Sequence, residues 1–196
     1  MKFPYGISDF LQVMSEGYFY VDRTDCIPLL EDLGKQLLFL RPRRFGKSLL
    51  LSMLANYYDV ANADQFESLF GRLAIGRGPT PLHNQYFVMR WDFSLVAAYG
   101  GAGEIARSLH DHVNSRIARF AETYRERLAA PIEIRPDNAI ASFEAALTAI
   151  ASTPSVIQFS TISFCFAALL SVGPSKRKRT PRSRAAFSAP ATTDMW

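Results

Sequence analysis

The clearest pattern along the chain is a stripe of hydrophobic residues at helical spacing within residues 105–128. Its members lie three or four positions apart: Ile105, Leu109, Val113, Ile117, Phe120, Tyr124 and Leu128. Residues spaced in this way share one face of an α-helix, so the stretch predicts a long amphipathic helix. A second helix is predicted over residues 140–150, with Asp137 and Asn138 as candidate caps at its start.

Shorter apolar segments in the first half of the chain predict two strands and an enclosed helix. Residues 36–40, just before Pro42, have the length and composition of a buried strand. Residues 47–58 contain no Gly or Pro and are apolar almost all round, which predicts a helix enclosed on most sides. Residues 86–93 are a second strand candidate.

Two short helices complete the predicted elements. Residues 22–24 offer caps for a helix through Ile27 and Leu30, and Pro28 falls in its first turn, where proline is tolerated. Residues 66–70 predict a helix that stops at Gly71. Strands that alternate with helices predict an α/β fold, a mostly parallel sheet flanked by helices.

Charge and composition divide the chain near Ser152. Residues 1–151 contain 16 Lys and Arg and 17 Asp and Glu, whereas residues 152–196 contain 6 Lys and Arg and one acidic residue, Asp194. The first part is therefore predicted to be a nearly neutral folded domain. The second part is apolar and then basic, and its end is rich in Ser, Ala, Pro and Arg, which is typical of a disordered tail.

The tail leaves two further possibilities open. Residues 155–172 are uncharged, but six of these 18 residues are Ser, Thr or Gln, so a membrane span is disfavoured. The basic residues 176–179 could bind nucleic acid, yet no neighbouring aromatic side chain offers a stacking surface, and a solvated tail is favoured.

Other residues with chemical potential give weaker signals. Residues 1–17 lack the charge and apolar run of a secretory signal, so we expect a cytoplasmic protein. Cys26 and Cys165 are too few for a disulfide framework and are expected to be ordinary thiols. His110 and His112 point to different sides of a helix, which disfavours a shared metal ion.

Residues 41–48, Arg-Pro-Arg-Arg-Phe-Gly-Lys-Ser, combine the features of a phosphate-binding loop between a strand and a helix. In such a loop, Gly46 would let the backbone approach a phosphate, and Lys47 would reach the terminal phosphates. Ser48 would bind Mg²⁺ through its hydroxyl. The general pattern asks for glycine where this chain has Arg41. The full candidate nucleotide-binding set is Arg43, Arg44, Phe45, Gly46, Lys47, Ser48 and Leu49. A basic surface turn is the alternative.

With these residues in place, the chain resembles the predicted AAA-ATPase-like family of bacteria over about its first 150 residues. The resemblance is carried by residues 3–10, 20–24, 38–54 and 66–70. It implies a P-loop NTPase core, in which arginine at position 41 looks usual, commonly followed by a domain similar to PD-(D/E)XK nucleases. Nothing in this chain matches that second domain.

The resemblance also implies an acidic strand for ATP hydrolysis, which would follow the second long helix. At that place, residues 155–163 contain no carboxylate. Asp92 is a possible substitute, but it is more typical of a strand-end cap. We therefore expect an incomplete P-loop core without the acidic Walker B strand. A truncated or frame-shifted gene would explain the loss, and translation of the surrounding DNA in the other frames would test this.

The sequence thus predicts a protein that binds ATP or GTP with Mg²⁺ and hydrolyses it poorly or not at all. The alternative is a non-catalytic remnant or a partner-binding fragment; a membrane-tethered protein is a third possibility. No protein partner is indicated.

Overall fold

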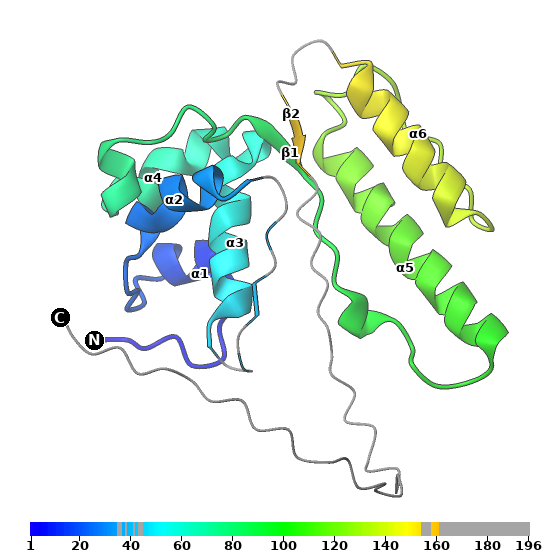
Figure 1. Cartoon of the computed structure of the whole chain (residues 1–196), viewed down its shortest axis with the longest axis horizontal. Coiled ribbons are helices and arrows are strands. Elements are labelled where there is room, and N and C mark those ends of the chain that lie inside the picture. The colour runs from blue at the N-terminus through cyan, green and yellow to red at the C-terminus, as the bar shows by residue number, and fades with distance from the viewer. Residues whose placement is uncertain (35–36, 38, 41, 43–44, 154–157, 161–196) are drawn as a thin grey trace, which may run out of the picture. The chain divides into compact units, whose positions relative to one another are not determined.

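The computed structural model of the chain describes residues 1–34, 37, 39–40, 42, 45–153 and 158–160 (Figure 1). The chain divides into two compact units, Met1–Phe166 and Ala167–Trp196. All described residues belong to the first unit, so the predicted tail from residue 161 onward lies outside the described residues. The basic cluster at 176–179 and most of the uncharged stretch at 155–172 lie there too.

The described residues form mainly helices. In chain order the elements are α1 (Phe10–Ser15), η1 (Thr24–Cys26), α2 (Ile27–Asp32), α3 (Lys47–Tyr58), η2 (Val60–Gln65), α4 (Phe66–Phe70), η3 (Ala74–Arg77), β1 (Tyr86–Val88), η4 (Phe93–Leu95), α5 (Ala102–Thr123), α6 (Ala139–Ala151) and β2 (Gln158–Ser160), where η denotes a 3-10 helix.

The predicted fold class, a parallel sheet flanked by helices, is wrong for this structure. Strand structure among the described residues is limited to β1 and β2, which pair in parallel with Tyr86 opposite Gln158 and Val88 opposite Ser160. The strand predicted over residues 86–93 is present only in its first three residues. Two short strands do not make the layer that an α/β fold requires.

The strand predicted over residues 36–40 is the main source of this error. Gln36 and Leu38 lie outside the described residues. Leu37, Phe39 and Leu40 are not in a strand, and they are 50%, 42% and 74% exposed. A short apolar run does not specify a strand unless a second strand is available to accept its backbone hydrogen bonds.

The predictions of the helices are confirmed more closely. α3 has the bounds predicted from the absence of Gly and Pro. α6 starts as expected, because the Asn138 side chain accepts a hydrogen bond from the Ala141 amide at 3.0 Å. α5 ends at Thr123, so the hydrophobic stripe continues past the helix to Leu128.

The two short helices are also present, with different terminal details. α2 has Pro28 in its first turn, but no side chain caps it. The carboxylate of Asp22 instead accepts hydrogen bonds from the amides of Thr24 and Ala74, which joins η1 to η3. α4 ends at Gly71, as predicted, although Gly71 has a right-handed φ of −56°.

An aromatic core fixes α3 against α1 and α4. Phe70 is fully buried, and its ring centroid lies 5.1 Å from that of Phe10, 5.3 Å from that of Phe66 and 5.4 Å from that of Tyr57. Tyr57 is also fully buried, and its hydroxyl accepts a hydrogen bond from the Thr80 amide at 2.8 Å. This packing determines the direction in which the N-terminus of α3 points.

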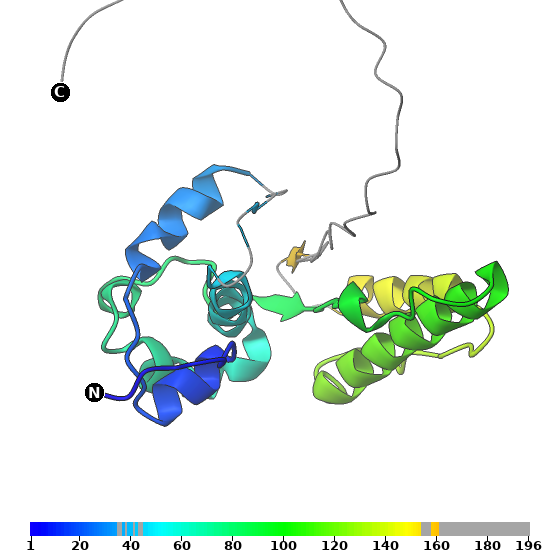
Figure 2. The same ribbon diagram turned by 90° about the horizontal axis from the view of Figure 1, so that it is seen from below.

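A second core joins β1 and the segment after it to the helix pair α5 and α6. The two helices lie side by side in Figures 1 and 2. The buried residues of this second core are Phe87, Met89, Trp91, Ile117, Phe120, Tyr124, Ala146 and Ile150. Because one face of α5 is buried in this core, the other faces remain available to line a cavity.

Candidate functional site

The start of α3 is a tight left-handed turn at Gly46. This residue has a φ of +72°, a conformation that residues with a side chain rarely adopt. The first helical hydrogen bond runs from the Leu50 amide to the Gly46 carbonyl at 2.9 Å. A Cβ built on Gly46 would have no atom within 4 Å, so the space beside the turn is open.

The amides of the first turn of α3 point out of the helix. Those of Ser48 and Leu49 precede the first helical hydrogen bond, and no described residue accepts a hydrogen bond from either. Unpaired amides and the helix dipole make such a terminus attractive to anions. The described backbone at the start of α3 therefore offers the amides of Ser48 and Leu49 to an anion.

The predicted site residues at this turn have different surroundings. Lys47 Nζ donates a hydrogen bond to the Pro42 carbonyl at 2.9 Å, which holds the ammonium beside the turn. Phe45 and Ser48 are exposed, whereas the side chain of Leu49 packs against the aromatic core and can offer only its amide. Arg43 and Arg44 lie outside the described residues.

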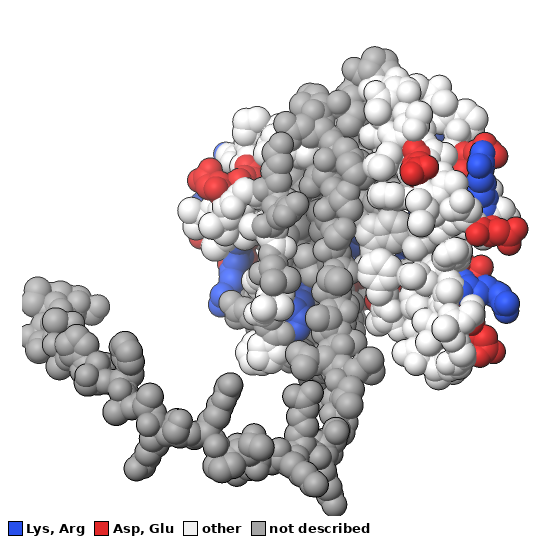
Figure 3. Space-filling model, turned by 45° about the vertical axis from the view of Figure 1, so that its right-hand side comes forward, with Lys and Arg blue, Asp and Glu red and all other residues white. Residues whose placement is uncertain are grey.

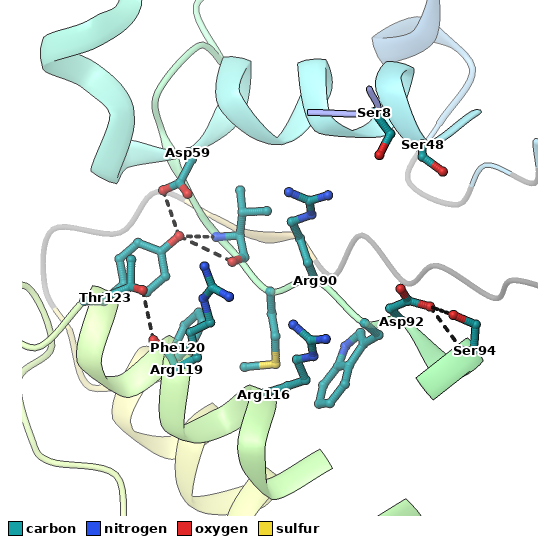
Figure 4. A pocket seen from close by; sticks show the side chains of 14 residues that line it. Ser8, Ser48, Asp59, Arg90, Asp92, Ser94, Arg116, Arg119, Phe120 and Thr123 are labelled. Carbon is teal, nitrogen blue, oxygen red and sulfur yellow. Dashed lines mark hydrogen bonds between the residues drawn. The ribbon is translucent and has the colours of Figure 1, made fainter. Parts of the chain in front are cut away.

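Ser48 also lines a cavity of about 640 Å³ that extends to β1 and α5 (Figure 4). Its lining residues come from five segments: Ser8, Ser48, Asp59, Val88, Met89, Arg90, Trp91, Asp92, Ser94, Arg116, Arg119, Phe120, Thr123 and Tyr124. This volume is within the range of small-molecule sites. The tertiary structure thus places the predicted metal ligand in a cavity large enough for a nucleotide's phosphates.

The cavity contains three arginines that no sequence pattern groups together. Arg116 and Arg119 lie three residues apart on α5, and Arg90 follows β1. The spacing of the first two indicates a shared helix face. Their proximity to Arg90, however, depends on the packing of α5 against β1.

Asp92 acts as a local cap, as predicted. Its carboxylate accepts hydrogen bonds from the amide and the hydroxyl of Ser94. The hydroxyl of Ser94 lowers the pKa of Asp92, and the positive charge of Arg116 contributes to this shift. Asp92 is therefore an ionised group in the wall of the cavity.

A hydrogen-bonded network ties the far wall of the cavity together. The hydroxyl of Tyr124 donates to Asp59 Oδ1 at 2.7 Å and accepts from the Val88 amide at 3.0 Å. Burial raises the pKa of Asp59 and that of Tyr124. The network connects the residue after α3, β1 and the end of α5.

Replacing Tyr124 with phenylalanine should lower the free energy of unfolding by about 1–3 kcal/mol, because the buried Val88 amide loses its acceptor and Asp59 loses a donor. Urea denaturation would measure the change. Tyr99→Phe is the matched control, because Tyr99 is 83% exposed and its hydroxyl is in water. Equal stability of the two variants would show that the network contributes nothing.

The structure also bears on the metal site, the membrane span and the acidic strand that were considered from the sequence. Within the described part of the chain, no group of three or more His, Cys, Asp or Glu residues is placed to hold a metal ion. No helix of that same part is long and apolar enough to cross a membrane. Of the region where the acidic strand was expected, only β2 is described, and it carries Gln158, Phe159 and Ser160.

Comparison with known proteins confirms the family resemblance drawn from the sequence. Residues 4–157 match the family described as Predicted AAA-ATPase. An uncharacterized protein in the vnfD 5' region of Azotobacter chroococcum mcd 1 is 32% identical over 143 residues, which cover 65% of this chain. The match spans only 24% of that relative's length. No solved structure matches the chain significantly. On the extent of the family match, the chain belongs to the predicted AAA-ATPase-like family.

Proposed function

We propose that this protein binds ATP together with Mg²⁺ at the N-terminus of α3 and hydrolyses it poorly or not at all. The observation that carries the proposal is the left-handed turn at Gly46, which puts Lys47 and Ser48 in the first helical turn beside an open space. Membership of the family supports the same assignment.

Each residue of the turn has a distinct role in this proposal. The amides of Ser48 and Leu49 donate hydrogen bonds to phosphate oxygens, and the ammonium of Lys47 moves from the Pro42 carbonyl to the terminal phosphates. The hydroxyl of Ser48 binds Mg²⁺. Phe45 directly precedes the turn and is a candidate contact for the nucleotide. Arg43 and Arg44 lie outside the described residues and are candidate contacts for the nucleotide or a partner on the basis of the sequence alone.

Weak hydrolysis follows from the residues available to activate water. The acidic strand that the family resemblance implies would supply a carboxylate to orient the attacking water near the terminal phosphate. β2, which pairs with β1, carries no carboxylate, and Asp92 is engaged by Ser94. We place this nucleotide binding in the cytoplasm, where ATP and Mg²⁺ are abundant.

A thermal unfolding experiment tests the proposal on the whole chain. A ligand present at 100 times its Kd stabilises the folded state by about 2.7 kcal/mol. For a chain of this size, we therefore expect Mg-ATP to raise Tm by roughly 5–10 °C. AMP lacks the terminal phosphates and is the control. No difference between Mg-ATP and AMP would contradict phosphate recognition.

A second candidate function, partner binding without nucleotide, is favoured by exposed apolar side chains. Leu29 and Leu33 on or next to α2 are 63% and 70% exposed, and Leu40 is 74% exposed. Exposed apolar groups that lie together commonly mark interaction surfaces. In this case, Tm would rise with protein concentration and would not respond to Mg-ATP.

A further inference from the structure

The charges in the cavity differ from those on the surrounding surface. On the face shown in Figure 3, basic and acidic side chains of described residues lie interspersed. In the cavity, the side chains of Arg90, Arg116 and Arg119 point into the same space (Figure 4). Asp59 and Asp92 line the same cavity, so three positive charges face two carboxyl groups, and this excess of positive charge favours an anionic ligand.

None of the three guanidinium groups forms an ion pair within the described part of the chain. The two carboxylates in the cavity wall are already engaged, Asp59 by Tyr124 and the Ala61 amide, and Asp92 by Ser94. The cavity therefore holds more basic than acidic side chains, and the guanidinium donors form no ion pair with a described residue.

The polar groups around the arginines fit a phosphate better than other anions. A guanidinium binds two phosphate oxygens at once through its parallel N–H groups. Hydroxyls of Ser8 and Ser48 line the same cavity and can donate to further oxygens. The hydroxyls of Ser94 and Thr123 also line it, but they already donate to Asp92 and to the Arg119 carbonyl. Arg90 and Arg119 are exposed, so a ligand can reach them from solvent.

We infer that Arg90, Arg116 and Arg119 form a binding site for a phosphate-bearing anion. This site differs from the proposed nucleotide site in the origin of its charges. Arg90 belongs to the segment after β1, and Arg116 and Arg119 belong to α5, whereas the nucleotide site is at the start of α3. The positive charge of Arg116 acts on a group of the cavity wall, since it contributes to lowering the pKa of Asp92 after the hydrogen bond from Ser94.

The phosphate has two possible sources, which share this chemistry. It belongs either to the phosphate chain of a nucleotide that is bound at Ser48, or to a separate phosphorylated molecule. Because Ser48 lines the same cavity as the arginines, a polyphosphate bound at Ser48 would share that cavity with them. The two sources differ in whether binding depends on Lys47.

Sodium tripolyphosphate is the probe, measured by thermal shift and calorimetry on the full chain at constant ionic strength. We expect it to raise Tm, and we expect Arg116→Ala and Arg90→Ala each to weaken its binding roughly tenfold. Arg107→Ala is the matched control, because Arg107 is exposed on α5 and does not line the cavity. Arg116→Gln replaces Arg116→Ala should the latter fail to fold.

The result with Lys47→Ala distinguishes the sources. If tripolyphosphate binding persists in Lys47→Ala but is lost in Arg116→Ala, the ligand is a separate phosphorylated molecule. Loss in both variants identifies a nucleotide polyphosphate that spans the cavity. An absence of binding, or equal binding by the Arg116→Ala, Arg90→Ala and Arg107→Ala variants, overturns the inference. Failure of the proposed ATP site would be distinguishable from failure of this inference. In that case tripolyphosphate would raise Tm in a way that depends on the arginines, whereas Mg-ATP would not change Tm.

Discussion

Replacing Lys47 with alanine is expected to weaken ATP binding roughly ten- to a hundredfold. The side chain supplies the fixed positive charge at the start of α3, and a hydrogen bond to a charged group contributes about 1.5–3 kcal/mol. Its loss corresponds to a decrease in affinity of roughly ten- to a hundredfold. Fluorescence anisotropy of a labelled ATP analogue in the presence of Mg²⁺ would measure the difference between wild type and variant.

Two controls make this result specific to the site. Lys2→Ala removes the same type of charge from a surface position, where Lys2 pairs with Glu16 at 3.3 Å, and should bind the analogue as wild type does. Urea denaturation should show little change in Lys47→Ala, since the bond to the Pro42 carbonyl is exposed. Unchanged affinity in a folded Lys47→Ala protein would rule out the assignment of the turn.

Replacing Phe70 with alanine should produce the largest loss of stability. Phe70 has no exposed surface and packs on Phe10, Phe66 and Tyr57. Truncation of a buried phenylalanine costs about 3–5 kcal/mol, through lost burial and the cavity that remains. Because domains are typically stable by about 5–15 kcal/mol, the variant should be close to unfolding.

Thermal and urea unfolding would measure this effect, with Tyr5→Ala as the control. Tyr5 is 97% exposed, so its truncation should change stability by less than about 0.5 kcal/mol. Phe70→Leu keeps most of the apolar volume and should fall between the two. Similar stability of the Phe70→Ala and Tyr5→Ala variants would mean that this aromatic cluster does not hold α3 in place.

The candidate site was only partly predictable from the sequence. Gly46, Lys47 and Ser48 are consecutive, so their type and order alone indicated a phosphate-binding turn, and the structure places them at a helix start. Arg90 and Arg116 are 26 positions apart, as their residue numbers show, and neither belongs to a recognisable motif. No local pattern could have joined them, because their proximity depends on how α5 packs.

The fold, like the candidate site, was predictable where it depends on neighbouring residues and not where it depends on residues far apart in the sequence. The sequence determined the helices, since a helix forms its hydrogen bonds between residues four apart and its caps lie next to it, as Asn138 shows for α6. A strand needs a partner that is distant in sequence. Only the tertiary structure could decide that Tyr86–Val88 pairs with Gln158–Ser160, and that the apolar residues before Pro42 form no strand where they are described.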